Sequence, residues 1–316
     1  MLSGKGFLPL LFSSLMIFGF AGCAEKNDVL SDGQNQQLEF SVTTQEWNNS
    51  NSSPSDSNPD SRATPISGNT FDTSKSFNVI ADVNYGGNWS TEVDNETASY
   101  STANKIWQTS ATHYWPGSSS IVNFYAYYPI SISGNITHTA GSAPVLSYTV
   151  PDNVADQIDI LASSQTGVAG DFYNQTPVDF KHIFAAIQFS VGSSGLLSGT
   201  ISSITISGTK HSGSYTSGSG WSLDTSTRAF TLSQSKTISG IFGENIYSGI
   251  YTLLMIPQTF NNATITLNYN NGTTFNTAIS GTWTAGNIYT YQLFKSVVYN
   301  YDYTGNVQTF TAPYTG

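Results

Sequence analysis

The sequence predicts an all-β protein built from antiparallel strands that are short enough for β-sandwiches. Charged residues make up only 9% of the 316 residues, so Ser, Thr, Asn, Gln and Gly must cover most of the surface, as they do on solvated sheet faces. Apolar and polar residues alternate along most readable segments, which is the period of a strand. No window has the period of an amphipathic helix. Together these observations favour sheets throughout the chain.

Composition also narrows the class of protein. Hydrophobic residues make up 38% and aromatic residues 13%, which indicates packed cores rather than disorder. The chain is long enough for one large core or two ordinary ones. The formal net charge is −10 and there are only 10 Lys and Arg residues, too few to neutralise phosphates. A nucleic-acid partner is therefore excluded.

Residues 1–22 are typical of a lipoprotein signal peptide. Lys5 precedes an apolar run at residues 7–20, which is shorter than the about 20 residues of a membrane span. Small residues then lead to Cys23, the only cysteine of the chain. We expect Cys23 to carry the lipid, with acyl chains such as palmitate, and to anchor the exported protein in a membrane. Ala24 lacks the acidic character associated with inner-membrane retention, which favours the outer membrane or cell surface. The alternative is an ordinary cleavage site beside a chance cysteine.

Residues 23–62 read as a tether, a first strand and a linker. The stretch "LEFSV" puts Leu38, Phe40 and Val42 on one face of a short strand. Residues 48–61 are rich in Ser, Asn and Pro, the composition of a flexible connector. Arg62, one of two arginines in the chain, closes this connector.

Beyond Arg62 the strand pattern is nearly continuous. "FNVIADVNY" at 77–85 alternates and is followed by a "GGN" turn, and "VNFYAYY" at 122–128 and "AAIQFSV" at 185–191 also alternate. The segment at 264–279 predicts a hairpin in which Asn271-Gly272 supplies the positive φ angles.

A Gly/Asn/Pro loop near residues 176–178 indicates a boundary between two domains of ordinary size. We expect an N-terminal β-sandwich at 63–177, a C-terminal β-sandwich at 178–296 and a strand-forming tail at 297–316.

Catalytic, metal and cofactor motifs are missing from the sequence. The histidines are far apart and lack metal-ligand spacing, and Asp152, Asp156 and Asp159 lack the pattern of a calcium loop. There is no nucleophile elbow and no phosphate loop. We expect no enzyme, no metal and no cofactor. A group of aromatic residues could form a sugar-stacking platform, although packing in a core is favoured: Tyr114, Trp115, Tyr125, Tyr127 and Tyr128.

Several stretches in order resemble the fimbrillin family of Bacteroidales, the subunits of type V pili and their relatives. They are the lipobox that ends at Cys23, "SRA" at 61–63, "HYWPGSSSIVNFYAYYP" at 113–129, "QIDILAS" at 157–163, "VDFKHIFAAIQFSV" at 178–191, "LLMIPQTF" at 253–260 and "WTAGNIYTYQL" at 283–293. The resemblance covers nearly the whole chain. It implies two tandem β-sandwiches of transthyretin-like topology.

The resemblance also implies how such a subunit assembles. An Arg-specific protease would cut after Arg62, leaving Ala63 as the new N-terminus and removing the lipid and the "LEFSV" strand. A neighbouring subunit's C-terminal strand would then fill the empty groove. The alternative is that Arg62 is a solvated linker residue and the subunit stays anchored. Arg228 offers the same Arg-Ala bond, in a segment that we expect to be a less accessible turn.

The tail supports a donor role, because it keeps a strand pattern where a polar, frayed end would be ordinary. An extra strand folded back on its own domain is the competing explanation. The donor-strand candidates are Val297, Tyr299, Tyr301, Tyr303, Val307 and Phe310.

We therefore expect a structural pilus subunit or fimbrillin-like surface lipoprotein. Its partners would be other pilus subunits, an Arg-specific surface protease and the membrane, and it would contribute to adhesion. The alternative is a surface glycan-binding lipoprotein that does not polymerise and binds through exposed aromatics such as Trp115.

Overall fold

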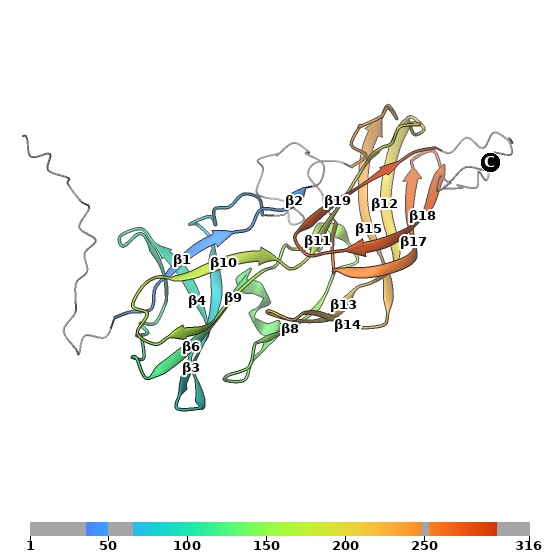
Figure 1. Cartoon of the computed structure of the whole chain (residues 1–316). Helices are drawn as coiled ribbons and strands as arrows, with labels where there is room; N and C mark the ends of the chain where they lie inside the picture. Colours follow the sequence, from blue (N-terminus) through green and yellow to red (C-terminus); the bar gives the residue numbers. More distant parts are fainter. Residues whose placement is uncertain (1–35, 50–65, 248–252, 296–316) are drawn as a thin grey trace, which may run out of the picture. The chain divides into compact units, whose positions relative to one another are not determined.

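β-Strands make up almost all of the regular structure in the computed structural model of the chain (Figure 1). It describes residues 36–49, 66–247 and 253–295. Its helical segments are the two short 3-10 turns η1 (Ile130–Asn135) and η2 (Val154–Asp156). The all-β prediction is confirmed. The expected signal peptide, Cys23, Arg62, Ala63 and all donor-strand candidates lie outside the described residues.

A closed barrel is formed by seven strands of the described part, in the order β1-β10-β9-β6-β3-β4-β5. Their bounds are β1 Phe40–Thr44, β3 Ser76–Tyr85, β4 Asn88–Ser101, β5 Ile106–Thr109, β6 Ser120–Tyr128, β9 Leu161–Ala169 and β10 Thr176–His182. β1 runs parallel to β10, whereas the other neighbours are antiparallel. A single residue pair, Phe40 with Trp107, closes the barrel between β1 and β5.

The other strands form three sheets. One has the order β16-β11-β19-β2, with β16 Leu253–Met255, β11 Ala185–Val191, β19 Asn287–Leu293 and β2 Asn48–Asn49. The next has the order β15-β12-β17-β18, with β15 Thr227–Ile238, β12 Gly199–Lys210, β17 Gln258–Tyr269 and β18 Thr274–Trp283. The last has the order β14-β13-β8-β7, with β14 Gly220–Leu223, β13 Ser212–Thr216, β8 Val145–Thr149 and β7 Ile136–Thr137.

Hydrogen bonding crosses the expected boundary between residues 177 and 178 in two places. β10 spans that point and pairs with β1 and β9 of the barrel. β8 pairs with β13, which lies far beyond the boundary in sequence. In addition, β19 runs parallel to both β11 and β2, which the expectation of antiparallel sandwiches did not include. The two tandem sandwiches therefore stay a prediction.

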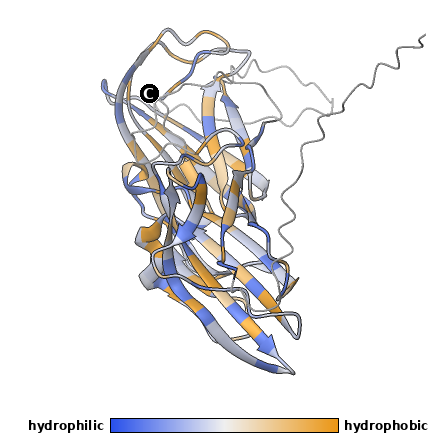
Figure 2. Cartoon of the chain, turned by 90° about the vertical axis from the view of Figure 1, so that its left-hand side faces the viewer, coloured by the Kyte–Doolittle hydropathy of each residue, from blue (hydrophilic) through white to orange (hydrophobic). Residues whose placement is uncertain are grey.

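Two hydrophobic cores hold these sheets together, and β3 and β6 contribute to both. Val122, Phe124 and Ala126 pack in the core inside the barrel, whereas Tyr125 and Tyr127 pack in the larger core with the strands of the second half. Figure 2 shows apolar and polar residues alternating along many of the strands. In β3 and β6, however, both faces are covered, so alternation there separates two cores rather than core from solvent.

The predicted hairpins are present, with one difference in turn geometry. Gly86 and Gly87 both have positive φ, 58° and 95°, which suits the two-residue turn between β3 and β4. Between β17 and β18 only Gly272 has positive φ, at 87°. Its N–H donates to the Tyr269 carbonyl at 3.0 Å, so this turn has three residues and Asn271 does not need the left-handed conformation.

Candidate functional site

The candidate site is the groove that holds β1, bounded by β10 on one side and β5 on the other; we call it the β1 groove. Along β10 the pairing is regular and covers five residues, from Phe40 with Thr176 to Thr44 with Phe180 (Figure 1). Backbone bonds extend it at both ends, because Thr176 N donates to Glu39 O at 2.8 Å and Gln45 N donates to Phe180 O at 2.8 Å.

The opposite side of the groove holds β1 less regularly. Phe40 pairs with Trp107, and Leu38 N donates to His113 O at 2.8 Å. Trp115 N in turn donates to Gln36 O at 2.9 Å. β1 is thus attached along one continuous ladder on the β10 side and through scattered bonds on the other side.

Apolar side chains of β1 and of the residues just before it fill the floor of the groove. Phe40 is only 1% exposed and Leu38 is equally buried. The ring of Phe40 lies edge-on to Phe77, with centroids 6.4 Å apart, and to Phe124, at 6.0 Å. Complete burial of such a side chain contributes about 1.5–3 kcal/mol through the hydrophobic effect. The strand expected at "LEFSV" overlaps β1, and Leu38 and Phe40 of that stretch face inward.

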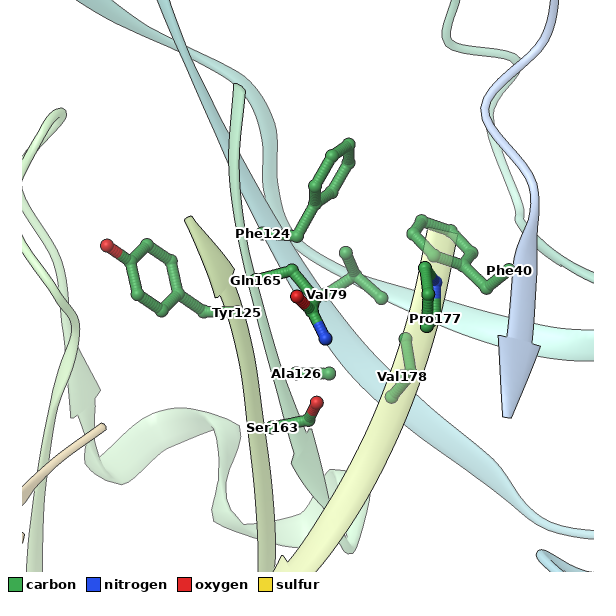
Figure 3. Close-up of a pocket in the computed structure, with 9 residues that line it drawn as sticks. All are labelled: Phe40, Val79, Phe124, Tyr125, Ala126, Ser163, Gln165, Pro177 and Val178. Atoms are coloured by element: carbon green, nitrogen blue, oxygen red, sulfur yellow. The ribbon is translucent and has the colours of Figure 1, made fainter. Parts of the chain in front are cut away.

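A small cavity lies beside Phe40, as Figure 3 shows. Its volume is about 10 Å³, at the lower limit for one water molecule, and much of its lining is apolar. Val79 lines it from β3, Phe124 lines it from β6, and Pro177 and Val178 line it from β10. It is a packing gap next to β1, too small to hold a sugar or a cofactor.

A second contact holds the segment that follows β1. Trp47 stacks on the imidazole of His182, with centroids 3.9 Å apart and an interplanar angle of 25°. His182 is 3% exposed, and its Nδ1 lies 3.0 Å from a carboxylate oxygen of Asp159, which is also buried. Ile66 N donates to Asp159 at 2.8 Å, and Trp47 Nε1 donates to Ile66 O at 3.0 Å. We call His182, Asp159 and Ile66 the Trp47 subsite.

Arg228 lies in a strand, not in the expected turn. It occupies the second position of β15 and pairs with Thr209 of β12. Its side chain is 56% exposed and its Nη1 donates to Asp152 Oδ2 at 3.1 Å. The prediction of a turn was wrong because the strand begins earlier than the alternating apolar residues indicate. The backbone at Arg228 is nevertheless engaged in a ladder, which disfavours entry into a protease cleft.

The aromatic residues that could have formed a sugar platform are mostly packed. Trp115 is 5% exposed and contacts Phe124 and Phe172, which agrees with the favoured interpretation of core packing and not with an exposed sugar platform. Tyr125 and Tyr127 are buried too, whereas Tyr114 is exposed. Local alternation could not reveal that both faces of β6 are covered.

The three aspartates that could have suggested a calcium loop do not share a site in the described part of the chain. Asp152, Asp156 and Asp159 each have a different partner: Arg228, Asn153 and His182. Within the described ranges, no three His, Cys, Asp or Glu side chains are placed to hold a metal ion. None of the helices in this part of the chain is long and apolar enough to cross a membrane.

The sequence pattern of the fimbrillin-like family matches residues 61–305, which is most of the chain. The chain belongs to the fimbrillin-like family. Such proteins are structural rather than enzymatic. The region of this chain that matches the family begins beside Arg62 and ends inside the C-terminal tail, so it includes the strands on both sides of the β1 groove.

Among the solved structures that are similar to this fimbrillin-like protein, one with a TM-score above 0.5 supports the fold. A candidate cell adhesion protein from Bacteroides ovatus is 14% identical, with a TM-score of 0.56 over 89% of this chain and 97% of the other. Another from Bacteroides uniformis is 17% identical, with a TM-score of 0.48 over 83% and 95%. The tip fimbrial protein Mfa3 from Porphyromonas gingivalis is 9% identical, with a TM-score of 0.32 over 71% and 91%. No curated protein matches the chain.

Proposed function

We propose that this fimbrillin-like protein is a structural pilus subunit at the cell surface that contributes to adhesion and polymerises by protease-triggered donor-strand exchange. The observation that carries the proposal is the position of β1. It fills an apolar groove between β10 and β5, yet it belongs to a segment that precedes the linker with Arg62. Cleavage after Arg62 would make β1 a separate, replaceable peptide.

The empty groove would be a strong acceptor for another strand. Without β1, β10 loses its parallel ladder partner and the floor residues Phe77 and Phe124 lose the ring of Phe40. Unpaired strand edges above exposed apolar side chains readily take up a new strand. The family to which the chain belongs supports pilus subunits as the source of that strand.

The C-terminal tail is the proposed donor. Its alternating candidates are Val297, Tyr299, Tyr301, Tyr303, Val307 and Phe310. The proposed export route places the lipid on Cys23 and the subunit at the outer membrane before cleavage leaves Ala63 at the new N-terminus.

The test is limited digestion of the purified, non-lipidated full chain with an Arg-specific protease, followed by N-terminal sequencing and native gel electrophoresis. We expect a new terminus at Ala63 and a ladder of oligomers. A chain without residues 296–316 should be cut equally well but stay monomeric, which controls for aggregation of the cut protein. Resistance at Arg62, a monomeric product of the full chain, or a ladder that persists without the tail would contradict the proposal.

A further inference from the structure

The Trp47 subsite would be left open by the proposed cleavage. Trp47 lies before the cut and would leave, whereas His182, Asp159 and Ile66 lie after it and would stay. The imidazole face now covered at 3.9 Å would then be uncovered. His182 Nε2 is buried and has no hydrogen-bond partner among the residues that the structure describes. The uncovered imidazole face of the Trp47 subsite is best covered by another flat aromatic ring.

The tail contains a segment that repeats the pattern of the segment around β1. Residues 38–47 read "LEFSVTTQEW" and residues 301–310 read "YDYTGNVQTF". An acidic residue stands second in both segments, Ser or Thr stands fourth, and Gln stands eighth. Both segments also end in a large aromatic residue, seven positions after the aromatic residue at their third position.

The repeated pattern follows burial in the groove. Among the inward positions of the first segment, Leu38, Phe40 and Thr44 are buried and Val42 is half-buried. The tail residues that correspond to the three buried positions carry apolar or aromatic side chains, Tyr301, Tyr303 and Val307, and Gly305 corresponds to Val42. Outward positions, such as Ser41 and Thr43, are exposed and correspond to polar tail residues, Thr304 and Asn306.

The tail could also pair with β10 in a second register, and the Trp47 subsite distinguishes the two. Placing Val297, Tyr299, Tyr301 and Tyr303 at the positions of Leu38, Phe40, Val42 and Thr44 also puts apolar side chains inward. In that register Asn306 would face the imidazole of His182 in place of Trp47, and an amide offers no ring to stack. Of these two registers, only the one that ends at Phe310 also places an aromatic ring at the Trp47 subsite.

We propose that His182 and Asp159 form a recognition subsite for an aromatic side chain of the incoming strand, and that Phe310 of a second copy of this chain fills it. Residues 301–310 of the second copy would run in the direction of β1, parallel to β10, with Tyr303 in the place of Phe40. Asp159 holds the imidazole in position through the contact with Nδ1, and Ile66 N fixes Asp159 from the mature side of the cut. This inference rests on the strand exchange proposed above.

Binding of a labelled peptide with the sequence of residues 296–316 to the chain that lacks these residues and has been cut at Arg62 tests the subsite, because this chain should stay monomeric and keep its groove free of another copy's tail. We expect Phe310→Ala to weaken binding about ten- to a hundredfold, from the loss of one buried ring. Phe310→Trp should bind at least as tightly as the natural peptide, since it restores the side chain now present. The matched control is Thr309→Ala, at the position that corresponds to the exposed Glu46, and it should change binding less than threefold.

A photoreactive benzophenone side chain at position 310 gives a second, independent measurement. Mass spectrometry should find the cross-link on the proteolytic fragment that contains His182. A cross-link elsewhere, or equal effects of Phe310→Ala and Thr309→Ala, would overturn the subsite while leaving strand exchange intact. If the natural peptide fails to bind the cut chain at all, the proposed function fails together with the subsite.

Discussion

Replacing Phe40 with alanine should destabilise the uncut chain by about 3–5 kcal/mol, the usual cost of a Phe→Ala change in a core. The side chain is 1% exposed and lies edge-on to Phe77 and Phe124. Each such aromatic pair contributes about 0.5–1.5 kcal/mol beyond the area that it buries. Removal of the ring would enlarge the cavity of about 10 Å³ that Phe40 already lines. A cavity that the surrounding strands do not close adds to the loss of stability.

The assay is guanidinium unfolding of the non-lipidated full chain, followed by circular dichroism. The matched control is Ser41→Ala, an exposed position on the same strand, which should change stability by about 0.5 kcal/mol at most. After cleavage at Arg62 the same loss should weaken retention of the free β1 segment by about a hundredfold or more, since about 1.4 kcal/mol corresponds to a tenfold change in affinity.

The reasoning is refuted if Phe40→Ala costs less than about 1 kcal/mol, well below the range for a buried phenylalanine. It is refuted equally if Ser41→Ala costs as much as Phe40→Ala, because the stability of the groove would then not depend on the inward ring. Either result would remove the energetic basis for treating β1 as the plug of an apolar groove.

Three further predictions concern the rest of the described chain. The peptide bond that follows Arg228 should resist the Arg-specific protease in the native protein, because β15 is paired with β12 at this point, and it should be cut in denaturant. Mass spectrometry of the fragments would show both results. Asp82→Asn should lower the free energy of unfolding by about 3–5 kcal/mol in thermal or denaturant unfolding, because the fully buried Asp82 carboxylate accepts a hydrogen bond from His138 Nε2 at 2.8 Å. The matched change at an exposed position, Asp94→Asn, should alter it little. Burial raises the pKa of Tyr127 from 10.0 to about 12, so its contribution to stability should be complete below pH 10 and decline as the pH rises towards 12. Urea unfolding across this pH range should show a shallower decline for Tyr127→Phe, and an unchanged slope would contradict the burial argument.

Local patterns predicted the strands well but not their partners. The alternation at 77–85 and the Gly-Gly turn correspond to β3 and its hairpin, and "LEFSV" overlaps β1. Alternation records which side chains share a face, whereas it carries no information on which strand lies alongside or whether that strand is parallel. The parallel pairing of β1 with β10 was for this reason not predictable.

The Trp47 subsite shows the same limit for a site. Trp47, Asp159 and His182 come from distant parts of the chain, and none stands in a motif with fixed spacing. A lone Trp after a strand and a lone His near the end of another give no sign that they stack. Only the fold brings them together, because β1 and β10 run side by side and in the same direction towards Trp47 and His182.

The two-faced strands β3 and β6 have a mechanical consequence. Phe124 packs inside the barrel and its neighbour Tyr125 packs in the larger core, so the same stretch of backbone is rigidly embedded on both sides. A pulling force that enters at the β1 groove would pass into the second half through the side chains packed in the larger core and along the backbone from β10 into β11, rather than across a sliding contact between separate bodies. We therefore expect extension under tension to be resisted by both cores at once, with rupture as one abrupt event rather than two successive steps.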